Sequence, residues 1–339
     1  MTAMRGVIGQ RDMLGRVSAR AARGEAGQAY GLFGPRSIGK RTVALRIAQT
    51  WNCTDPKRPA GGCGTCLACV KIERGLHPDV QLIERAADKT VIEIQQIRDM
   101  QQHLALRPLE GRKRVIIIDD AGELNLLTQD VLLKTLEEPP IHAILLVITL
   151  AATVLSETIQ SRLQPLTFRY VRAGEIAEGL TARKVKDADR IAATSGGLPG
   201  LAIRLAADEG GERTMRTGLE QELLKLVSSG LTDRFGWAAG LADESDPRKR
   251  VRAIDVRFEQ WVEIMRDAAL TARGVEVTPL RPDRVMQTGR IAAGASARDL
   301  IDVTLLIEKL RRDLAWNANA RAMLELFALR LPYVAGVAA

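Results

Sequence analysis

The stretch Gly31-Leu32-Phe33-Gly34-Pro35-Arg36-Ser37-Ile38-Gly39-Lys40-Arg41-Thr42 decides the expected fold. Gly34, four further residues, and then Gly39 and Lys40 match most of a phosphate-binding loop. The apolar run Ala29–Phe33 precedes the loop, and a helical pattern over Thr42–Trp51 follows it. This order predicts a buried strand, a loop that can surround phosphate groups, and a helix whose N-terminus faces an anion.

One position departs from the motif. A serine or threonine normally follows the Gly-Lys pair, and its hydroxyl binds Mg²⁺. Arg41 occupies that position, and Thr42 comes one residue late. Arginine has only donors and a permanent positive charge, so it cannot coordinate a cation. The sequence therefore leaves open whether the loop hydrolyses ATP, only binds ATP or ADP, or only keeps the shape of such a site.

The composition is that of a globular chain with an excess of positive charge. The 339 residues are 46% hydrophobic and 27% charged, and 49 basic residues against 41 acidic ones give a net charge of +8. This length predicts two or three domains. The first 50 residues hold nine basic and two acidic side chains. Such a region suits phosphates or an acidic partner surface, although arginine-rich codon usage explains part of the pattern.

The N-terminal residues Met1–Val7 lack the apolar segment of a secretory signal. The longest apolar run, Ile141–Leu155, is interrupted by His142 and is too short to span a bilayer. We therefore expect a cytoplasmic protein. Structural disulfides are not expected in that compartment.

Four cysteines lie close together, at Cys53, Cys63, Cys66 and Cys69. The turn-rich segment between them contains prolines and glycines and is too small for a core of its own. Four thiolates at this spacing suit tetrahedral Zn²⁺, and a site filled by four protein ligands is structural. Four unrelated cysteines or an iron–sulfur cluster remain alternatives.

Aliphatic runs alternate with helical patterns as far as residue 169. Expected strands are Ala29–Phe33, Val80–Ile83, Val115–Ile118, Ala143–Thr149 and Pro165–Phe168, and expected helices include Thr42–Trp51, Val91–Leu106 and Asn125–Leu136. This alternation predicts a parallel α/β sheet with helices on both faces. Asp119 and Asp120 close the third strand, where an active nucleotide site places carboxylates near Mg²⁺. Beyond Val171 the pattern predicts only helices, with Trp237, Trp261 and Trp316 as core or interface anchors.

Taken together, these motifs resemble the AAA+ subunits of the bacterial DNA polymerase III clamp loader, most closely the delta-prime type. The resemblance runs along most of the chain and rests on Ile8-Gly9-Gln10, the phosphate loop, the four cysteines, His77-Pro78-Asp79, Ile94 with Ile97-Arg98, Lys113 with Asp119-Asp120-Ala121, Leu132-Leu133-Lys134-Thr135-Leu136-Glu137-Glu138-Pro139-Pro140, Ser161-Arg162-Leu163-Gln164, and Asn317-Ala318-Asn319-Ala320-Arg321. Leu163 stands where the family has cysteine after Ser-Arg.

The resemblance implies three domains. They are a nucleotide-binding-type AAA+ domain over residues 1–170 with an inserted zinc module at 53–69, a small helical lid over 171–208, and an all-α collar over 209–339. It also implies a pentamer with motor subunits of the gamma/tau type and a delta-type subunit. That assembly opens a ring-shaped sliding clamp and places it on primer–template DNA. ATP lies between neighbouring subunits.

The resemblance assigns roles to residues, and several departures qualify them. Gly34, Gly39, Lys40, Arg41, Thr42, Asp119 and Asp120 would form a degenerate nucleotide site in which Mg²⁺ binding is doubtful. Asp120 replaces the glutamate that orients water, and Pro199 stands where the lid should offer an arginine, with Arg204 more than a turn later. Arg162 would be an arginine finger acting in trans on a neighbour's ATP.

Two other functions remain open from the sequence. One is an active gamma/tau-like ATPase in which Thr42 and Asp120 substitute for the missing groups. The other is a stand-alone zinc-containing DNA-binding protein. Arg98, Arg107, Arg112 and Arg114 are candidates for contacts with a DNA backbone, or for solvated surface positions.

Overall fold

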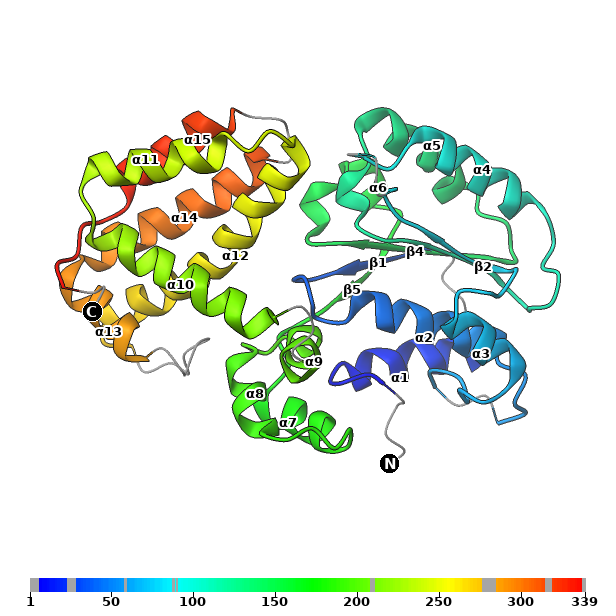
Figure 1. The fold of residues 1–339 in the computed structure, drawn as a ribbon. Coiled ribbons are helices and arrows are strands. Elements are labelled where there is room, and N and C mark those ends of the chain that lie inside the picture. Colours follow the sequence, from blue (N-terminus) through cyan, green and yellow to red (C-terminus); the bar gives the residue numbers. More distant parts are fainter. Residues whose placement is uncertain are drawn as a thin grey trace. The chain divides into compact units, whose positions relative to one another are not determined.

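The computed structural model describes residues 6–22, 29–57, 60–86, 89, 91–207, 211–275, 285–314 and 319–336. The chain divides into two compact units, which are considered separately (Figure 1). The first comprises Met1–Lys184 with Gly197–Leu201, and the second comprises Val185–Gly196 with Ala202–Ala339. The boundary falls within the expected lid, and the division into three domains stays a prediction.

The first unit is built on a five-stranded sheet with the order β2-β3-β4-β1-β5, in which every neighbouring pair is parallel. Its strands are β1 (Ala29–Phe33), β2 (Val80–Ile83), β3 (Arg114–Ile118), β4 (Ala143–Thr149) and β5 (Gln164–Thr167). Its helices are α1 (Arg11–Ala22), α2 (Lys40–Asn52), α3 (Leu67–Glu73), α4 (Ile94–Ala105), η1 (Ala121–Glu123), α5 (Leu126–Glu137), η2 (Ala152–Val154), α6 (Glu157–Gln160) and α7 (Ala173–Thr181).

Helices cover both faces of this sheet, which confirms the predicted α/β class (Figure 1). Side chains of successive strand residues point to opposite faces. Ile116 and Ile118 therefore join the core beneath α4 and α5, while Val115 and Ile117 are fully buried on the other face. Burial on both faces explains why β3 and β4 read as uninterrupted aliphatic runs.

Side-chain caps and prolines set the ends of α4 and α5. A reciprocal capping box between Glu93 and Gln96 begins α4. The Oδ1 atom of Asn125 accepts the backbone N–H of Thr128 at 2.9 Å and begins α5. Pro139 and Pro140 follow the last turn of α5 and cannot continue the helix. These local signals account for the agreement between the predicted and observed helices.

The described residues of the second unit form helices joined by turns and loops. Its helices are α8 (Ala188–Thr194), α10 (Glu212–Ser228), α11 (Leu231–Ala242), α12 (Pro247–Ala272), α13 (Val285–Gly294), α14 (Ala297–Leu314) and α15 (Ala320–Arg330), and α9 (Pro199–Ala207) crosses between the two units. Trp261 is fully buried and stacks on Phe327 with ring centroids 5.5 Å apart. Trp237 packs 5.6 Å from Trp261, so both are core anchors as predicted. Trp316 lies outside the described residues.

A buried arginine and an asparagine cap organise the C-terminal helices. The Arg234 guanidinium donates to the backbone carbonyls of Leu226, Val227 and Leu331, tying the end of α10 to the segment after α15. Asn319 Oδ1 accepts the backbone N–H groups of Arg321 and Ala322 and begins α15. Asn319 thus has a capping role, while Asn317 and Ala318 lie outside the described residues. In the ranges that the structure covers, no helix has the length and apolarity needed to cross a membrane.

Candidate functional site

The phosphate loop leaves the carboxyl end of β1, which lies between β4 and β5, and leads into α2. Gly34 donates its N–H to the carbonyl of Leu150 at 3.1 Å, and Phe168 donates to the carbonyl of Phe33 at 2.7 Å. A Cβ atom at Gly34 would lie 2.7 Å from Cβ of Phe168, so no larger residue fits between these strand ends. Gly39 precedes α2 at a φ of 99°, a conformation that favours glycine.

Lys40 is buried at the start of α2. Its ammonium group donates to the carbonyls of Gly34 at 2.5 Å and Pro35 at 2.8 Å. Burial lowers the pKa of Lys40 to about 8, and the nearby Asp120 and Asp119 only partly oppose that effect. The lysine therefore lies in the place that the motif gives it, turned onto the loop.

Arg41 forms a bridge across the position expected for a metal ion. Its Nη1 atom lies 2.7 Å from Glu84 Oε2 and 3.3 Å from Asp119 Oδ2. The guanidinium of Arg41 thus pairs with the carboxylate of Asp119, which the sequence predicted to lie near Mg²⁺. Thr42 is the next residue along α2, about 100° around the helix axis, so its side chain leaves the helix in a different direction from that of Arg41.

The second acid of the pair is also met by an arginine of the loop. Arg36 Nη2 lies 3.7 Å from Asp120 Oδ2. Burial raises the pKa of Asp119, while the positive charge of Arg41 opposes the rise. The structure therefore brings Gly34, Gly39, Lys40, Arg41, Asp119 and Asp120 together, and their role as a nucleotide site stays a prediction. Glu84, at the end of β2, is a partner that sequence reasoning missed.

The start of α9 closes over the same loop. The Gly200 N–H donates to the carbonyl of Ser37 at 2.7 Å, and a Cβ atom at Gly200 would lie 2.8 Å from that oxygen. Pro199, the first residue of α9, has an apolar ring in place of the expected arginine. Arg204 belongs to the second unit. The backbone of α9 therefore meets the loop at Ser37.

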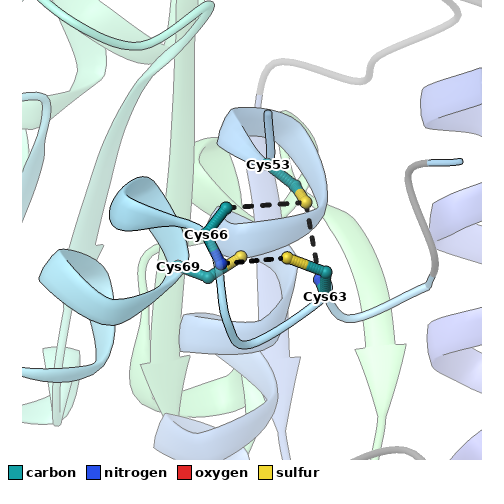
Figure 2. A group of neighbouring side chains, drawn as sticks. All are labelled: Cys53, Cys63, Cys66 and Cys69. Atoms are coloured by element: carbon teal, nitrogen blue, oxygen red, sulfur yellow. Dashed lines mark hydrogen bonds between the residues drawn. The ribbon is translucent and has the colours of Figure 1, made fainter. Parts of the chain in front are cut away.

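The four cysteines converge at the end of α2 and the start of α3, as Figure 2 shows. Their sulfur atoms all lie within 4.8 Å of one another. In a tetrahedral zinc site with Zn–S distances of about 2.3 Å, the sulfurs would be about 3.8 Å apart. The Sγ atoms of Cys53 and Cys66 are 3.9 Å apart. This geometry fits the predicted four-thiolate site.

Backbone donors and a glycine shape this cluster. The N–H of Cys63 points to Cys53 Sγ at 3.4 Å, and the N–H of Cys66 points to Cys63 Sγ at 3.2 Å. Such contacts favour the thiolate form that binds metals. Gly62 has a φ of 75°, and a Cβ atom there would lie 2.8 Å from Cys69 Sγ. Gln49 Nε2 donates to the carbonyl of Cys69 at 2.8 Å and anchors the module on α2.

Arg162 lies at the amino ends of the parallel strands, whereas the phosphate loop lies at their carboxyl ends. It precedes β5, whereas the loop follows the neighbouring parallel strand β1. β1 and β5 pair over four positions, which span three residue steps of about 3.3 Å, so the two ends are roughly 10 Å apart. The Arg162 Nη2 atom lies 2.6 Å from Glu137 Oε1. The structure therefore separates Arg162 from the nucleotide-type site of its own chain.

One of the candidate DNA-contacting arginines has another role. Arg114 is buried, donates to the carbonyls of His103 and Arg107, and lies 3.5 Å from Asp79. The interpretation of Arg114 as a backbone-tracking or solvated residue is therefore wrong. Its position at the start of a doubly covered strand directs its side chain into the protein.

Comparison with known proteins agrees with this architecture. The family described as DNA polymerase III, delta subunit, matches residues 9–172. The DNA polymerase III subunit delta' of Pseudomonas aeruginosa is 31% identical over 214 residues, which cover 62% of this chain and 64% of that protein. The tau subunit of Escherichia coli is 28% identical over 317 residues, covering 90% of this chain and 47% of that protein.

The match therefore spans less than two thirds of the length of these relatives. Among solved structures, a DNA polymerase III gamma subunit-related protein of Thermotoga maritima covers 92% of this chain and 97% of its own, at 13% identity and a TM-score of 0.44. A likeness at that score carries no argument, so the similarity rests on the sequence matches alone. Residues 9–172 of this chain therefore match the family of DNA polymerase III delta subunits, and the chain is similar in sequence to delta' and tau subunits of that polymerase.

Proposed function

We propose that this chain is a delta-prime-like subunit of the DNA polymerase III clamp loader. It assists ATP-dependent loading of the sliding clamp onto primed DNA and supplies Arg162 to the ATP site of a neighbouring subunit. Its own ATP hydrolysis is absent or weak. The observation that carries this proposal is the ion pair of Arg41 with Asp119 and Glu84 at the expected Mg²⁺ position.

The charge arrangement supports a site without turnover. Phosphoryl transfer depends on a metal ion that bridges phosphate oxygens and neutralises developing charge. For Mg²⁺ to bind, Asp119 must give up its ion pair with Arg41. The positive guanidinium of Arg41 would then lie beside the positive metal ion. The side chain of Asp120 is one methylene shorter than the usual glutamate and is paired with Arg36. A loop that keeps its shape and binds ADP or ATP weakly is consistent with this arrangement.

The topology supports action in trans for Arg162. A finger stabilises charge on a transferring phosphoryl group only when its guanidinium reaches that group. Because Arg162 precedes β5 and the phosphate loop follows the neighbouring parallel strand β1, the two lie at opposite ends of the strands. Arg162 therefore suits the ATP of an adjacent subunit, held in a site like that of the gamma/tau type.

The implied partners are motor subunits of the gamma/tau type and a delta-type subunit in a cytoplasmic pentamer. The sliding clamp and primer–template DNA are reached through that assembly. The basic excess of the first 50 residues is compatible with such contacts. Solo DNA binding, as in a stand-alone zinc protein, has no specific observation in its favour.

The runner-up is a catalytically active gamma/tau-like subunit. The match to the Escherichia coli tau subunit, which covers 90% of this chain, favours it. Turnover would then need Thr42 and Asp120 to replace the missing hydroxyl and glutamate. Lys40→Ala would abolish ATP hydrolysis by the isolated chain with primed DNA in that case.

Reconstitution with the motor and delta-type subunits of the same bacterium tests the proposal. We expect Arg162→Ala to lower clamp-dependent ATP turnover by about 10³-fold. Lys40→Ala should leave it within about twofold, since only turnover-competent sites contribute a phosphate-loop lysine to the rate. Arg190→Ala, which removes an exposed arginine that also pairs with a carboxylate, is the control. Full activity of Arg162→Ala would refute the trans role, and loss of activity in Lys40→Ala would favour the runner-up.

We also propose that the four cysteines bind one structural Zn²⁺. The ion would cross-link the end of α2 to α3 and leave no open coordination position. Metal analysis of the purified chain should find zinc, and chelation should lower its thermal stability. Full zinc content in Cys66→Ser would refute the assignment.

A further inference from the structure

The side chain of Arg162 is held by its own subunit. Its Nη2 atom donates to Glu137 Oε1 at 2.6 Å. Its Nη1 atom donates to the carbonyl of Thr158 at 2.9 Å and to the Ser161 hydroxyl at 3.3 Å. These contacts use three of the five N–H groups of the guanidinium. The arginine thus has a defined orientation before any neighbour binds, with donor capacity left for phosphate oxygens.

Glu137 is itself fixed by its position in the fold. It is the last residue of α5, and two prolines prevent the helix from continuing beyond Glu138. Gln101 Nε2, on α4, donates to the carbonyl of Val131 and to the hydroxyl of Thr135 and ties α5 to its neighbour. The carboxylate that meets Arg162 therefore projects from a helix packed on the sheet, and not from a loop.

Stability does not account for this pair. The side chain of Arg162 is 33% exposed and that of Glu137 is 47% exposed. Ion pairs with this much solvent access contribute little to folding, because water screens them and both side chains lose rotamer freedom. The ion pair instead restricts the rotamers of Arg162, the side chain that must be oriented in the proposed function. Fixing a reacting group in advance removes an entropic cost from the reaction.

We propose that Glu137 is a positioning residue for Arg162, which orients the guanidinium for the ATP of the adjacent subunit. This inference rests on the proposed function of Arg162. Glu137 does not touch the nucleotide and acts only through the arginine. The requirement is for an acceptor oxygen at this place, so glutamine serves in place of glutamate. Alanine does not.

The test is steady-state ATP turnover by the reconstituted pentamer with clamp and primed DNA. Glu137→Ala should lower kcat by about tenfold and leave KM for ATP unchanged, because the orientation of a transition-state group is lost. Glu137→Gln should stay within about twofold of wild type, since its amide oxygen still accepts from Nη2. Glu138→Ala, at the adjacent exposed position, is the control and should be silent.

A double variant separates this role from a structural one. In the Arg162→Ala background, Glu137→Ala should cause no further loss, because its effect acts through the missing arginine. An equal fall in both backgrounds, or an unchanged kcat in Glu137→Ala while Arg162→Ala is inactive, would overturn the inference alone. Full activity of Arg162→Ala would instead overturn the proposed function. Circular dichroism melting of each variant verifies that it is folded.

Discussion

Replacing Arg41 by threonine should convert the phosphate loop into a metal-dependent nucleotide site. The substitution supplies the hydroxyl that the motif places after Gly-Lys and removes the cation beside Asp119. Asp119 and Glu84 then face an open position at the carboxyl ends of the strands. Mg²⁺ bound there meets one or two carboxylates, the hydroxyl and phosphate oxygens, which is the ligand set that this ion prefers.

The cost to folding should be small. The side chains of Arg41, Glu84 and Asp119 are 49%, 54% and 23% exposed, so loss of the ion pairs should cost about 1 kcal/mol or less. Binding then adds stability by mass action. At a ligand concentration of about 100 times Kd, the gain is roughly 2.7 kcal/mol. For a unit of this size, that gain corresponds to a Tm increase of about 5–10 °C.

Thermal unfolding of the wild type and the variant should be compared with ADP alone, with ADP and MgCl₂, and with ADP and EDTA. We expect a Mg²⁺-dependent increase in Tm only for Arg41→Thr. Arg41→Lys keeps a cation at the position and serves as the matched control. A Mg²⁺-dependent shift of the wild type as large as that of the variant would refute the view that Arg41 replaces the metal. The absence of a shift in the variant would show that Arg41 is not the obstacle.

Three further predictions concern Asp79, Lys40 and Gly62. Asp79 accepts backbone N–H groups of Leu109, Glu110 and Gly111 at 2.7–2.8 Å, and Asp79→Asn should cost about 3 kcal/mol in urea unfolding at pH 7, because buried Arg114 loses its counter-charge. Burial opposes ionisation of Asp79, but these N–H groups and Arg114 outweigh it and lower the pKa of Asp79. The stabilisation from ionised Asp79 is therefore complete above the ordinary carboxyl pKa and is lost as the pH falls through the lowered pKa. An identical loss of stability at acid pH in the wild type and the variant would contradict this. Burial lowers the pKa of Lys40 from 10.5 to about 8, so between these pH values the folded chain has released a proton that the unfolded chain keeps. The free energy of unfolding should therefore rise with pH between pH 8 and pH 10.5, and this rise should be absent from Lys40→Met. Gly62→Ala places a Cβ atom 2.8 Å from Cys69 Sγ and should reduce zinc content and the Tm difference between metal-loaded and chelated protein, whereas Gly75→Ala, which has open space at the same kind of φ, should retain zinc.

Much of the first unit could be predicted from local sequence. The strands β1 and β4 have the predicted bounds, because continuous apolar runs between turn signals are typical of doubly covered strands. The edge strand β2 also has its predicted bounds, although Gln81 interrupts its apolar run. The strand β5 is shifted by one residue from its prediction, at Gln164–Thr167. It lies at the sheet edge with alternating burial, where a short pattern defines the ends of a strand less sharply. The cysteine spacing predicted the cluster, since its members lie within 17 residues of one another.

The sequence by itself determined the phosphate-loop shape, the alternation of strands and helices, and the four-cysteine cluster, because each depends on residues that are close along the chain. Only the tertiary structure decided that Arg41 meets both Asp119 and Glu84. Those two acids end the neighbouring strands β3 and β2, and the strand register brings them together. The same holds for Arg162, whose partner Glu137 lies on a different element. Side-chain partners across elements depend on strand order and helix packing, which local periodicity does not encode.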